Sequence, residues 1–119
     1  MLPNNDIVFD EFVIRQHDGN WDLYYIPNKE KLATFFLRSC SLIAANYYRT
    51  HHFTEYGEVK QLDRNYKRNY LNSIIHRHSL KTAEDFDTKV IILNQLECSE
   101  ADAEFYKTKI SRLFKWSFV

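Results

Sequence analysis

Histidine is the residue type in this chain that most directly suggests metal or acid–base chemistry. His76 and His78 flank Arg77, but on a helix a spacing of two points the imidazoles about 200° apart, so they could share a metal only in a strand. His51 and His52 are adjacent in the sequence and meet the same objection. No acidic or cysteine ligand at a zinc-site spacing accompanies either pair. The sequence therefore predicts surface histidines and no metal site.

The two cysteines, Cys40 and Cys98, show no CxxC motif and no disulfide-framework spacing. We expect reduced, half-buried thiols, and no basic sequence context favours a thiolate nucleophile at either position. The chain also lacks a Gly-x-Ser-x-Gly elbow and a phosphate-binding loop, and its two glycines cannot build a dinucleotide fingerprint. The sequence thus predicts no catalytic residue, no cofactor and a protein that is not an enzyme.

One helical segment carries an enzyme-like pattern. Arg68 and Asn69 precede His76, and this order resembles the Arg–polar pair and following histidine of the all-helical HEPN ribonucleases. The resemblance covers a single helix, the interval before the histidine is longer than is usual in that family, and paired strands at the N-terminus are foreign to it. It implies a ribonuclease-like alternative, without a catalytic role for any of these residues.

Length and composition predict one small soluble domain over residues 1–119. Hydrophobic residues make up 45% of the chain and charged residues 27%, which is typical of a globular protein and excludes a disordered one. Gly and Pro number only 2 each, which favours helices over turn-rich β-sandwiches. Residues 1–10 lack the pattern of a signal peptide and no apolar run could span a bilayer, so we expect a cytoplasmic protein without a membrane partner.

The clearest local signal is the turn sequence Asp18-Gly19, which lies between β-branched and aromatic runs at 7–16 and 21–26. Counting outward from this turn places Arg15 opposite Asp22, so the sequence predicts a β-hairpin over residues 7–26. The side chains of its predicted inner face are Phe12, Ile14, Trp21, Leu23 and Tyr25. Those of its outer face, which another element or another chain should cover, are Val8, Val13, Tyr24 and Ile26.

Helical spacing begins at Asn28, which is expected to cap a helix over about 28–50. This helix should fade near His51, and Gly57 marks a break before a second helix over 59–77. The second helix is rich in basic residues on the side away from its apolar stripe.

Two further helices are expected over 83–97 and 100–116, because residues 82–85 and 99–102 resemble capping boxes with Asp in place of Glu. The apolar run 90–93 could instead form a short buried strand. Together these segments predict a mostly helical α+β fold, in which the N-terminal β-hairpin packs on a bundle of about four α-helices.

Charge is unevenly distributed along the chain. The formal balance is −4 over residues 1–30, +6 over 31–82, −6 over 83–104 and +4 over 105–119. Helix dipoles explain the acids at predicted helix starts and the bases at the last helix end. The basic second helix and the acidic segment 83–104 are left as candidate binding surfaces.

The acidic side chains predict a surface for a basic protein, in the way that small inhibitors of nucleases compete for a phosphate site. The residues of this predicted protein-binding surface are Asp18, Asp22, Glu97, Glu100, Asp102 and Glu104. The sequence therefore predicts a non-catalytic inhibitor or antidote, such as an immunity protein or a phage-encoded blocker, that acts on a toxin or a nuclease.

Nucleic-acid binding is the alternative function. Basic residues interleaved with tyrosines can hold RNA through phosphate contacts and stacking, but Tyr66 and Tyr70 share the apolar stripe and are expected in the core. The candidate nucleic-acid-binding residues are Arg64, Lys67, Arg68 and Arg77. A third hypothesis is a homodimer in which a second chain covers the outer face of the hairpin.

Overall fold

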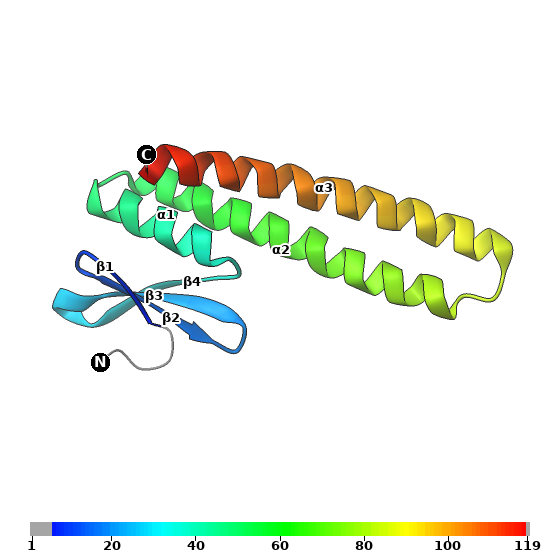
Figure 1. Cartoon of the computed structure of the whole chain (residues 1–119), viewed down its shortest axis with the longest axis horizontal. Coiled ribbons are helices and arrows are strands. Elements are labelled where there is room, and N and C mark those ends of the chain that lie inside the picture. The colour runs from blue at the N-terminus through cyan, green and yellow to red at the C-terminus, as the bar shows by residue number, and fades with distance from the viewer. Residues whose placement is uncertain (1–5, 119) are drawn as a thin grey trace.

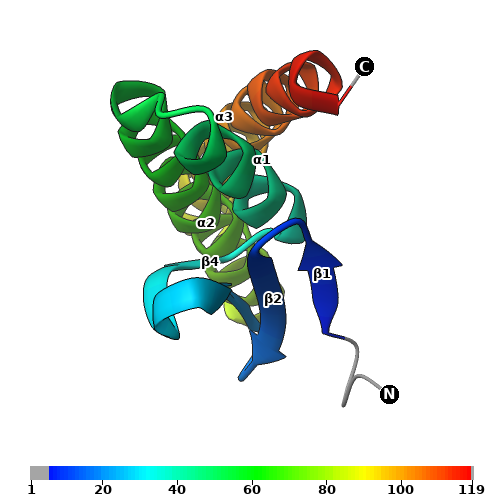
Figure 2. The ribbon, with the colours of Figure 1, turned by 90° about the vertical axis from the view of Figure 1, so that its left-hand side faces the viewer.

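The computed structural model of the chain describes residues 6–118 and has an α+β fold, in which an antiparallel sheet precedes three helices. The strands are β1 (Ile7–Phe9), β2 (Phe12–His17), β3 (Asn20–Tyr25) and β4 (Glu30–Phe35), and they lie side by side in that order. The helices are α1 (Arg38–Arg49), α2 (Phe53–Thr82) and α3 (Phe86–Phe118), and a 3₁₀ turn, η1 (Ile26–Asn28), joins β3 to β4. Figure 1 and Figure 2 show that α1 lies over one face of the sheet and that α2 and α3 pack on α1.

The predicted β-hairpin is confirmed as β2 and β3. The observed register pairs Arg15 with Asp22, as counting from the turn requires. Asp18 and Gly19 both adopt the left-handed region, with φ values of 50° and 78°, and this turn geometry matches the twist of the flanking strands. The predicted inner face packs against α1, with Phe12, Ile14 and Leu23 fully buried. On the opposite face Val8 is exposed, whereas Val13 and Tyr24 are half-buried; Ile26 is exposed but lies in η1, beyond the end of β3.

The sheet contains two strands that the sequence analysis misses. Residues 7–16 do not form one strand, because the chain turns at Asp10 (φ 53°) and β1 folds back to pair with β2. Residues 30–35, for which the sequence predicts a helix, form β4. The physical reason is that β3 offers an unpaired edge, and pairing along it buries the alternating side chains of Ala33 and Phe35.

The first helix is correspondingly shorter than predicted, because α1 begins at Arg38. Asn28 caps no helix; its Oδ1 instead accepts the backbone N–H of Glu30 at 3.0 Å and stabilises the turn into β4. The predicted end near His51 is confirmed, since α1 stops at Arg49 and His51 adopts a left-handed conformation with φ 63°.

The second helix is longer than predicted. It begins at Phe53 and continues through Gly57, where the sequence predicts a break. A single glycine costs a helix only about 1 kcal/mol. Burying the neighbouring Val59, which is 1% exposed, contributes about 1.5–3 kcal/mol and outweighs that cost.

The third helix is continuous and replaces two predicted helices. Its N-cap is Asp85, whose carboxylate accepts the backbone N–H of Thr88 at 3.0 Å. The predicted start at Ser99 is absent because Ser99 donates its hydroxyl to the carbonyl of Gln95, one turn earlier in the same helix, at 3.0 Å. Residues 90–93 are also helical, so the alternative strand does not form.

The hydrophobic core lies between the sheet, α1 and the adjoining ends of α2 and α3. We call this part, residues 6–66 and 106–118, the body, and we call the remaining hairpin of α2 and α3, residues 67–105, the arm. Figure 1 shows the arm extending past the edge of the sheet. The arm makes the molecule elongated, 58 × 28 × 21 Å, with a radius of gyration of 17.5 Å. A compact chain of this length would have about 13–14 Å. The largest buried side chains of the core are Phe12, Ile14, Leu23, Phe35, Ile43 and Val59.

Candidate functional site

The acidic residues predicted to bind a partner lie in two separate parts of the molecule. Asp22, in β3, is buried and accepts the Thr34 hydroxyl at 2.6 Å. Its cross-strand neighbour Arg15 donates to Asp6 at 2.8 Å, and this contact lowers the pKa of Asp6. Asp18 is exposed at the β2–β3 turn of the body. The four others lie exposed on α3 in the arm: Glu97, Glu100, Asp102 and Glu104.

The four candidate nucleic-acid-binding residues lie along α2 and point in different directions around the helix. Arg77 donates to Glu100 across the arm at 2.7 Å. Lys67 lies over the ring of Phe36 in the body, 5.8 Å from its centroid. Arg64 lines a cavity of about 160 Å³ together with Lys67, and Arg68 donates to Asn65 on another side of α2 at 3.4 Å. The structure therefore brings two of the four bases together and separates them from Arg68 and Arg77.

The tyrosines expected in the core lie where the body meets the arm. Tyr66 is half-buried and stacks on Tyr70 with ring centroids 5.8 Å apart, and Phe36 of the body contacts both rings. Tyr70 itself is exposed, so the prediction of a core position holds for Tyr66 only in part and is wrong for Tyr70. Beyond Tyr66, the apolar stripe of α2 therefore lies outside the core.

The cysteines and the paired histidines occupy unrelated positions. Cys40 is fully buried in α1, where desolvation raises its thiol pKa well above the usual range, whereas Cys98 is exposed on α3; neither is half-buried. His76 faces α3, while His78 is exposed on another side of α2. Within residues 6–118, no three side chains of the metal-binding types gather at one point.

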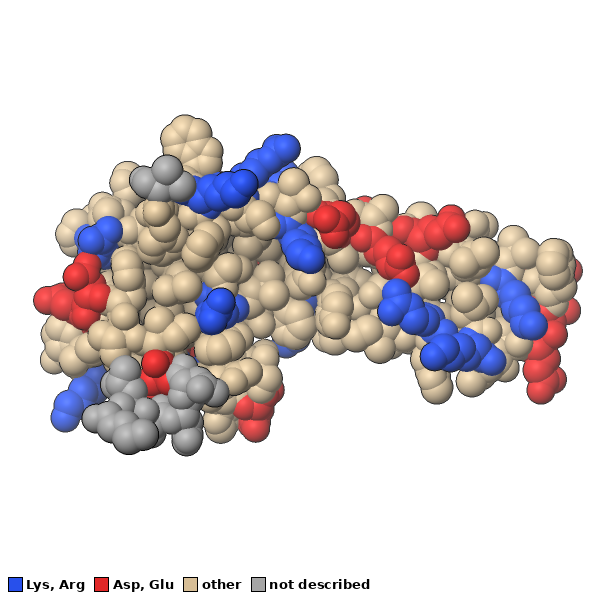
Figure 3. Space-filling model, in the orientation of Figure 1, with Lys and Arg blue, Asp and Glu red and all other residues tan. Residues whose placement is uncertain are grey.

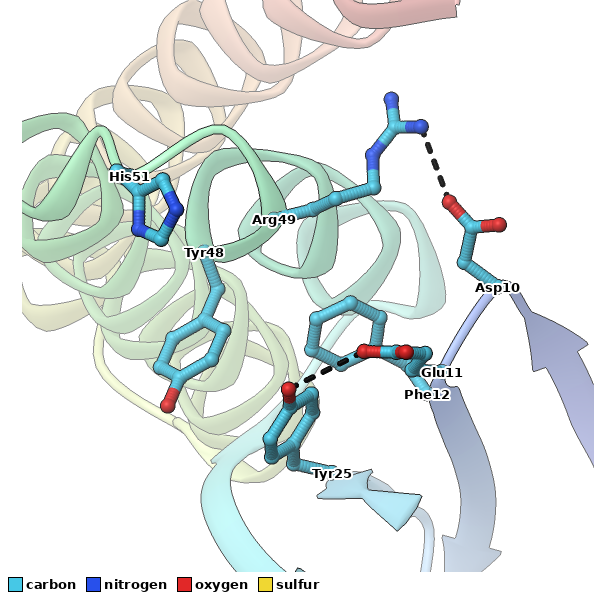
Figure 4. Close-up of a pocket in the computed structure, with 7 residues that line it drawn as sticks. All are labelled: Asp10, Glu11, Phe12, Tyr25, Tyr48, Arg49 and His51. Atoms are coloured by element: carbon cyan, nitrogen blue, oxygen red, sulfur yellow. Dashed lines mark hydrogen bonds and ion pairs between the residues drawn. The ribbon is translucent and has the colours of Figure 1, made fainter. Parts of the chain in front are cut away.

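An open cavity of about 330 Å³ lies at the end of α1, on the body. Figure 4 shows its walls, in which Asp10 accepts a hydrogen bond from Arg49 at 3.0 Å and Glu11 accepts one from the Tyr25 hydroxyl at 3.1 Å. The latter bond raises the pKa of Tyr25. These two hydrogen bonds hold the β1–β2 turn against α1 and β3. Because both carboxylates are already hydrogen-bonded within the chain, the cavity does not indicate a catalytic site. The remaining lining residues are Phe12, Tyr48 and His51.

The two helices of the arm meet along a coiled-coil seam. Buried and half-buried residues recur on each helix at alternating steps of three and four, as in a two-stranded coiled coil. In the body this seam is made of large side chains, but in the arm it includes small or polar ones. The seam residues of α2 are Val59, Leu62, Tyr66, Asn69, Ser73, His76 and Leu80. Those of α3 are Ile92, Leu96, Ser99, Ala103, Tyr106, Ile110 and Leu113.

Outside the seam, the arm exposes many large apolar side chains. The most exposed, Phe86, has 75% of its surface accessible, and Ile75 and Ile91 have 58% each. A soluble protein that acts alone rarely leaves so many such side chains on one element. The other exposed apolar residues of the arm are Tyr70, Leu71, Ile74, Val90, Leu93 and Phe105.

Helical spacing places most of these side chains on two lateral faces, one on each side of the seam. Leu71 and Ile75 lie on the outer side of α2. What we call the first face contains acids on α3 and bases on α2, joined by the ion pair of Arg77 with Glu100. Figure 3 shows acidic and basic side chains next to one another along the arm. The α3 row of this face is Phe86, Val90, Leu93, Glu97, Glu100 and Glu104. The α2 row is Lys67, Tyr70, Ile74, Arg77 and Lys81.

What we call the second face lies on the other side of the seam and has a different charge pattern. Its α3 row mixes acidic and apolar side chains, and the adjoining α2 side chains are mostly polar and uncharged. Arg68 lies at the outer edge of this α2 strip, where its guanidinium donates to Asn65 at 3.4 Å. Lys109 of the body lies over the ring of Phe105 at 4.7 Å, where this face ends. The α3 row is Asp87, Ile91, Asn94, Cys98, Asp102 and Phe105. The α2 residues beside it are Asn72 and Ser79, and Asn65 of the body continues the strip.

These two faces are not among the surfaces predicted from the sequence. The signal that could have found them is the number of apolar residues in the arm. The Ile74–Ile75 pair and the run 90–93 hold more apolar side chains than one seam between two helices can bury. Such an excess predicts a further packing partner.

Comparison with protein families, with curated protein sequences and with solved structures gave no match. Among the helices of the described chain, none combines the length and the apolar character that crossing a bilayer requires.

Proposed function

We propose that the protein is a non-catalytic binding module that acts in the cytoplasm as an inhibitor or antidote. It docks the second face of its arm on a basic protein, such as a toxin or a nuclease. One observation carries this proposal: α3 sets the exposed side chains of Ile91 and Phe105 among the carboxylates of Asp87 and Asp102, beside a largely uncharged strip of α2. This pattern complements a target that has apolar side chains among basic ones.

The apolar side chains would supply most of the affinity. Ile91 and Phe105 are 58% and 53% exposed, and a target that covers them removes that surface from water at about 25 cal/mol per Å². They project from a helix that the body holds at one end, so binding requires no folding of this surface. A preformed surface loses little conformational entropy on binding.

The carboxylates would act mainly on the rate of association, because opposite charges steer a target toward a charged surface. Of the acids predicted from the sequence, we assign Asp102 to this contact and add Asp87. Glu100 is neutralised by Arg77, and helical spacing turns Glu97 away from the second face together with Glu104.

The proposal is tested by capturing the target from the native host with the tagged protein, identifying it and titrating it in purified form. Replacing Ile91→Ser and Phe105→Ser together should weaken target binding about 100-fold, as expected for the loss of two central contacts. Asp87→Asn with Asp102→Asn should lower the association rate and its dependence on salt. An unchanged affinity in the double serine variant would refute the proposed surface.

The matched control is Arg64→Ala, which removes charge from a residue that lines a cavity with Phe36 and Lys67, away from the second face. It should bind the target like the wild type, and all variants should keep the helical circular dichroism of the wild type. Single-stranded RNA serves as the second ligand. A further variant, Arg64→Ala with Arg68→Ala, is tested with RNA alone. If RNA binds the wild type and does not bind this variant, nucleic-acid binding replaces the proposed function.

A further inference from the structure

We infer that the cavity between the sheet and α2 is a second binding site of the body, for a phosphate group that is free or is carried as a monoester by a small molecule. The cavity has a volume of about 160 Å³ and is lined by the start of β3, the end of β4 and one side of α2. This site goes beyond the proposed function, because it lies on the body and takes a small anion instead of a protein.

The bases of the cavity carry the inference. Lys60, Arg64 and Lys67 follow one another along α2 at steps of four and three residues, and all three line the cavity. The ion pairs within residues 6–118 include none of these three side chains. Like charges at such spacings repel each other and destabilise a helix. An anion that binds among them therefore removes an unfavourable interaction.

One acid, Asp63, also lines the cavity, but the bases outnumber it. Its two oxygens already accept the backbone N–H groups of Phe36 at 2.8 Å and Leu37 at 3.0 Å. Three bases and one carboxylate leave the lining with a formal charge of +2. A phosphate monoester carries about −1.5 to −2 at neutral pH, so its charge matches that of the lining.

The donors and the size of the cavity suit a phosphate group. The guanidinium of Arg64 is a planar fork that can donate two parallel hydrogen bonds to phosphate oxygens, whereas an ammonium acts as a point charge. Asn20 adds the amide donors of its side chain from β3. The volume of about 160 Å³ is well below the roughly 300–1,000 Å³ of sites that enclose a drug-sized ligand. The cavity therefore holds the phosphate, and the rest of a larger ligand lies outside it.

The surroundings favour a small molecule over a nucleic-acid strand. Lys60 and Lys67 are half-buried, and each ammonium lies over an aromatic ring, that of Tyr56 at 5.9 Å and that of Phe36 at 5.8 Å. A strand presents a row of phosphates and needs a row of bases. The next base along α2, Arg68, lies on another side of the helix and donates to Asn65 at 3.4 Å. The positive charge is thus concentrated at one point.

The experiment titrates the ¹⁵N-labelled full chain with inorganic phosphate and follows its amide signals by NMR. Phosphate rises to about 20 mM, which covers millimolar dissociation constants, while sodium chloride is lowered to hold the ionic strength constant. The amide signals of Asn20, Phe36 and Arg64 should shift and saturate. Glycerol 3-phosphate, with glycerol as its control, distinguishes the two sources: tighter binding than that of inorganic phosphate assigns a phosphomonoester, and weaker binding assigns free phosphate.

Two double variants test whether the cavity is the site. Lys60→Gln with Arg64→Gln should weaken phosphate binding about 100-fold, because it removes two charge-assisted contacts. The matched control, Arg68→Gln with Lys81→Gln, removes the same charge from α2 outside the cavity and should bind phosphate like the wild type. Thermal unfolding establishes that both variants are folded. Phosphate should raise the unfolding temperature of the wild type and of the control, but not that of the Lys60/Arg64 variant.

Amide signals that do not move, or that move without saturating, would overturn this inference. Equal weakening in the two double variants would overturn it as well, since the effect would then follow total charge and not the cavity. Single-stranded RNA that binds while inorganic phosphate does not would replace the small molecule with a nucleic acid. None of these results affects target binding by the second face, because the cavity shares no residue with that face.

Discussion

The body and the arm share the same two long helices, α2 and α3, yet the body buries the apolar side chains of these helices and the arm exposes many of them. In the body, Val59 of α2 and Ile110 of α3 are 1% and 2% exposed, because α1 and the sheet add further layers. In the arm, Ile75 and Ile91 have no such layer and lie mostly in water. A pair of helices can bury only one stripe of each, so a stable two-helix extension with more apolar stripes calls for another chain.

The largest expected contrast between the two regions is in thiol reactivity. Cys98 on the arm is exposed, whereas Cys40 in the body is fully buried with a raised thiol pKa. Cys40 should therefore be alkylated on the order of a thousandfold more slowly than Cys98, since it reacts only when the body opens. Iodoacetamide labelling followed by peptide mass spectrometry measures both rates. Comparable rates would mean that the body is as open as the arm.

The second contrast is in the free energy of unfolding. Ile14→Ala removes a fully buried side chain from the inner face of the sheet and should cost about 2–5 kcal/mol. Ile91→Ala removes an exposed one and should change the stability of the monomer by less than about 0.5 kcal/mol. Urea unfolding compares the two variants. Equal losses would show that the arm packs as tightly as the body.

Asp63 is a buried link within the body, and its loss should have an intermediate effect. Its carboxylate, on α2, accepts the backbone N–H groups of Phe36 at 2.8 Å and Leu37 at 3.0 Å, just before α1. Asp63→Asn leaves one acceptor oxygen for two donors and should cost about 1–2 kcal/mol at neutral pH. Unfolding in guanidinium chloride measures this loss, and a variant as stable as the wild type would show that the two bonds contribute little.

The same substitution also makes a prediction about pH. Desolvation raises the pKa of Asp63 in the folded protein, and this outweighs the two backbone hydrogen bonds that lower it. A raised folded pKa means that the contribution of this group is fully present below the unfolded value near 3.8 and is lost as pH rises through the folded pKa. The stability advantage of the wild type over Asp63→Asn should therefore grow as pH is lowered. A difference that shrinks toward acid pH would contradict the assigned shift.

The smallest expected effect is a gain in stability. Gly57 lies inside α2, and a Cβ atom built there meets no heavy atom within 4 Å. Gly57→Ala should therefore stabilise the protein by about 0.5–1 kcal/mol, because alanine restricts the unfolded chain and favours the helix. Thermal unfolding checks this value. A loss of stability would mean that the start of α2 depends on the flexibility of glycine.

Sequence reasoning succeeds where one local signal has one structural meaning. The Asp18-Gly19 turn fixes the pairing of Arg15 with Asp22, since the side chains of a strand alternate and the turn has a fixed length. It fails at β4, because Leu32, Phe35 and Phe36 also satisfy helical spacing. The edge of β3 that decides between strand and helix is a tertiary feature that no local pattern contains.

The candidate site is less predictable for a related reason. The sequence predicts Glu97 at the end of one helix and the other three acids, Glu100, Asp102 and Glu104, in the next. All four lie on the continuous helix α3, and their grouping depends on which side of α3 meets α2. That seam separates Asp102 from the three glutamates. The sequence predicts a helix start at Ser99, which splits α3 into two helices. The directions of Glu97 and Glu100 around one continuous helix therefore could not be compared from the sequence.

The order of the sheet has a consequence for how the chain reaches its native state. Each strand pairs with its neighbour in sequence, so the entropy of loop closure is small at every step of sheet formation. The ring of Phe9 in β1, however, meets that of Phe118 at the end of α3, with centroids 5.5 Å apart. This contact closes a loop of almost the whole chain, and such closures are slow. The sheet should therefore assemble early, and the return of α3 to β1 should be the late, rate-limiting event.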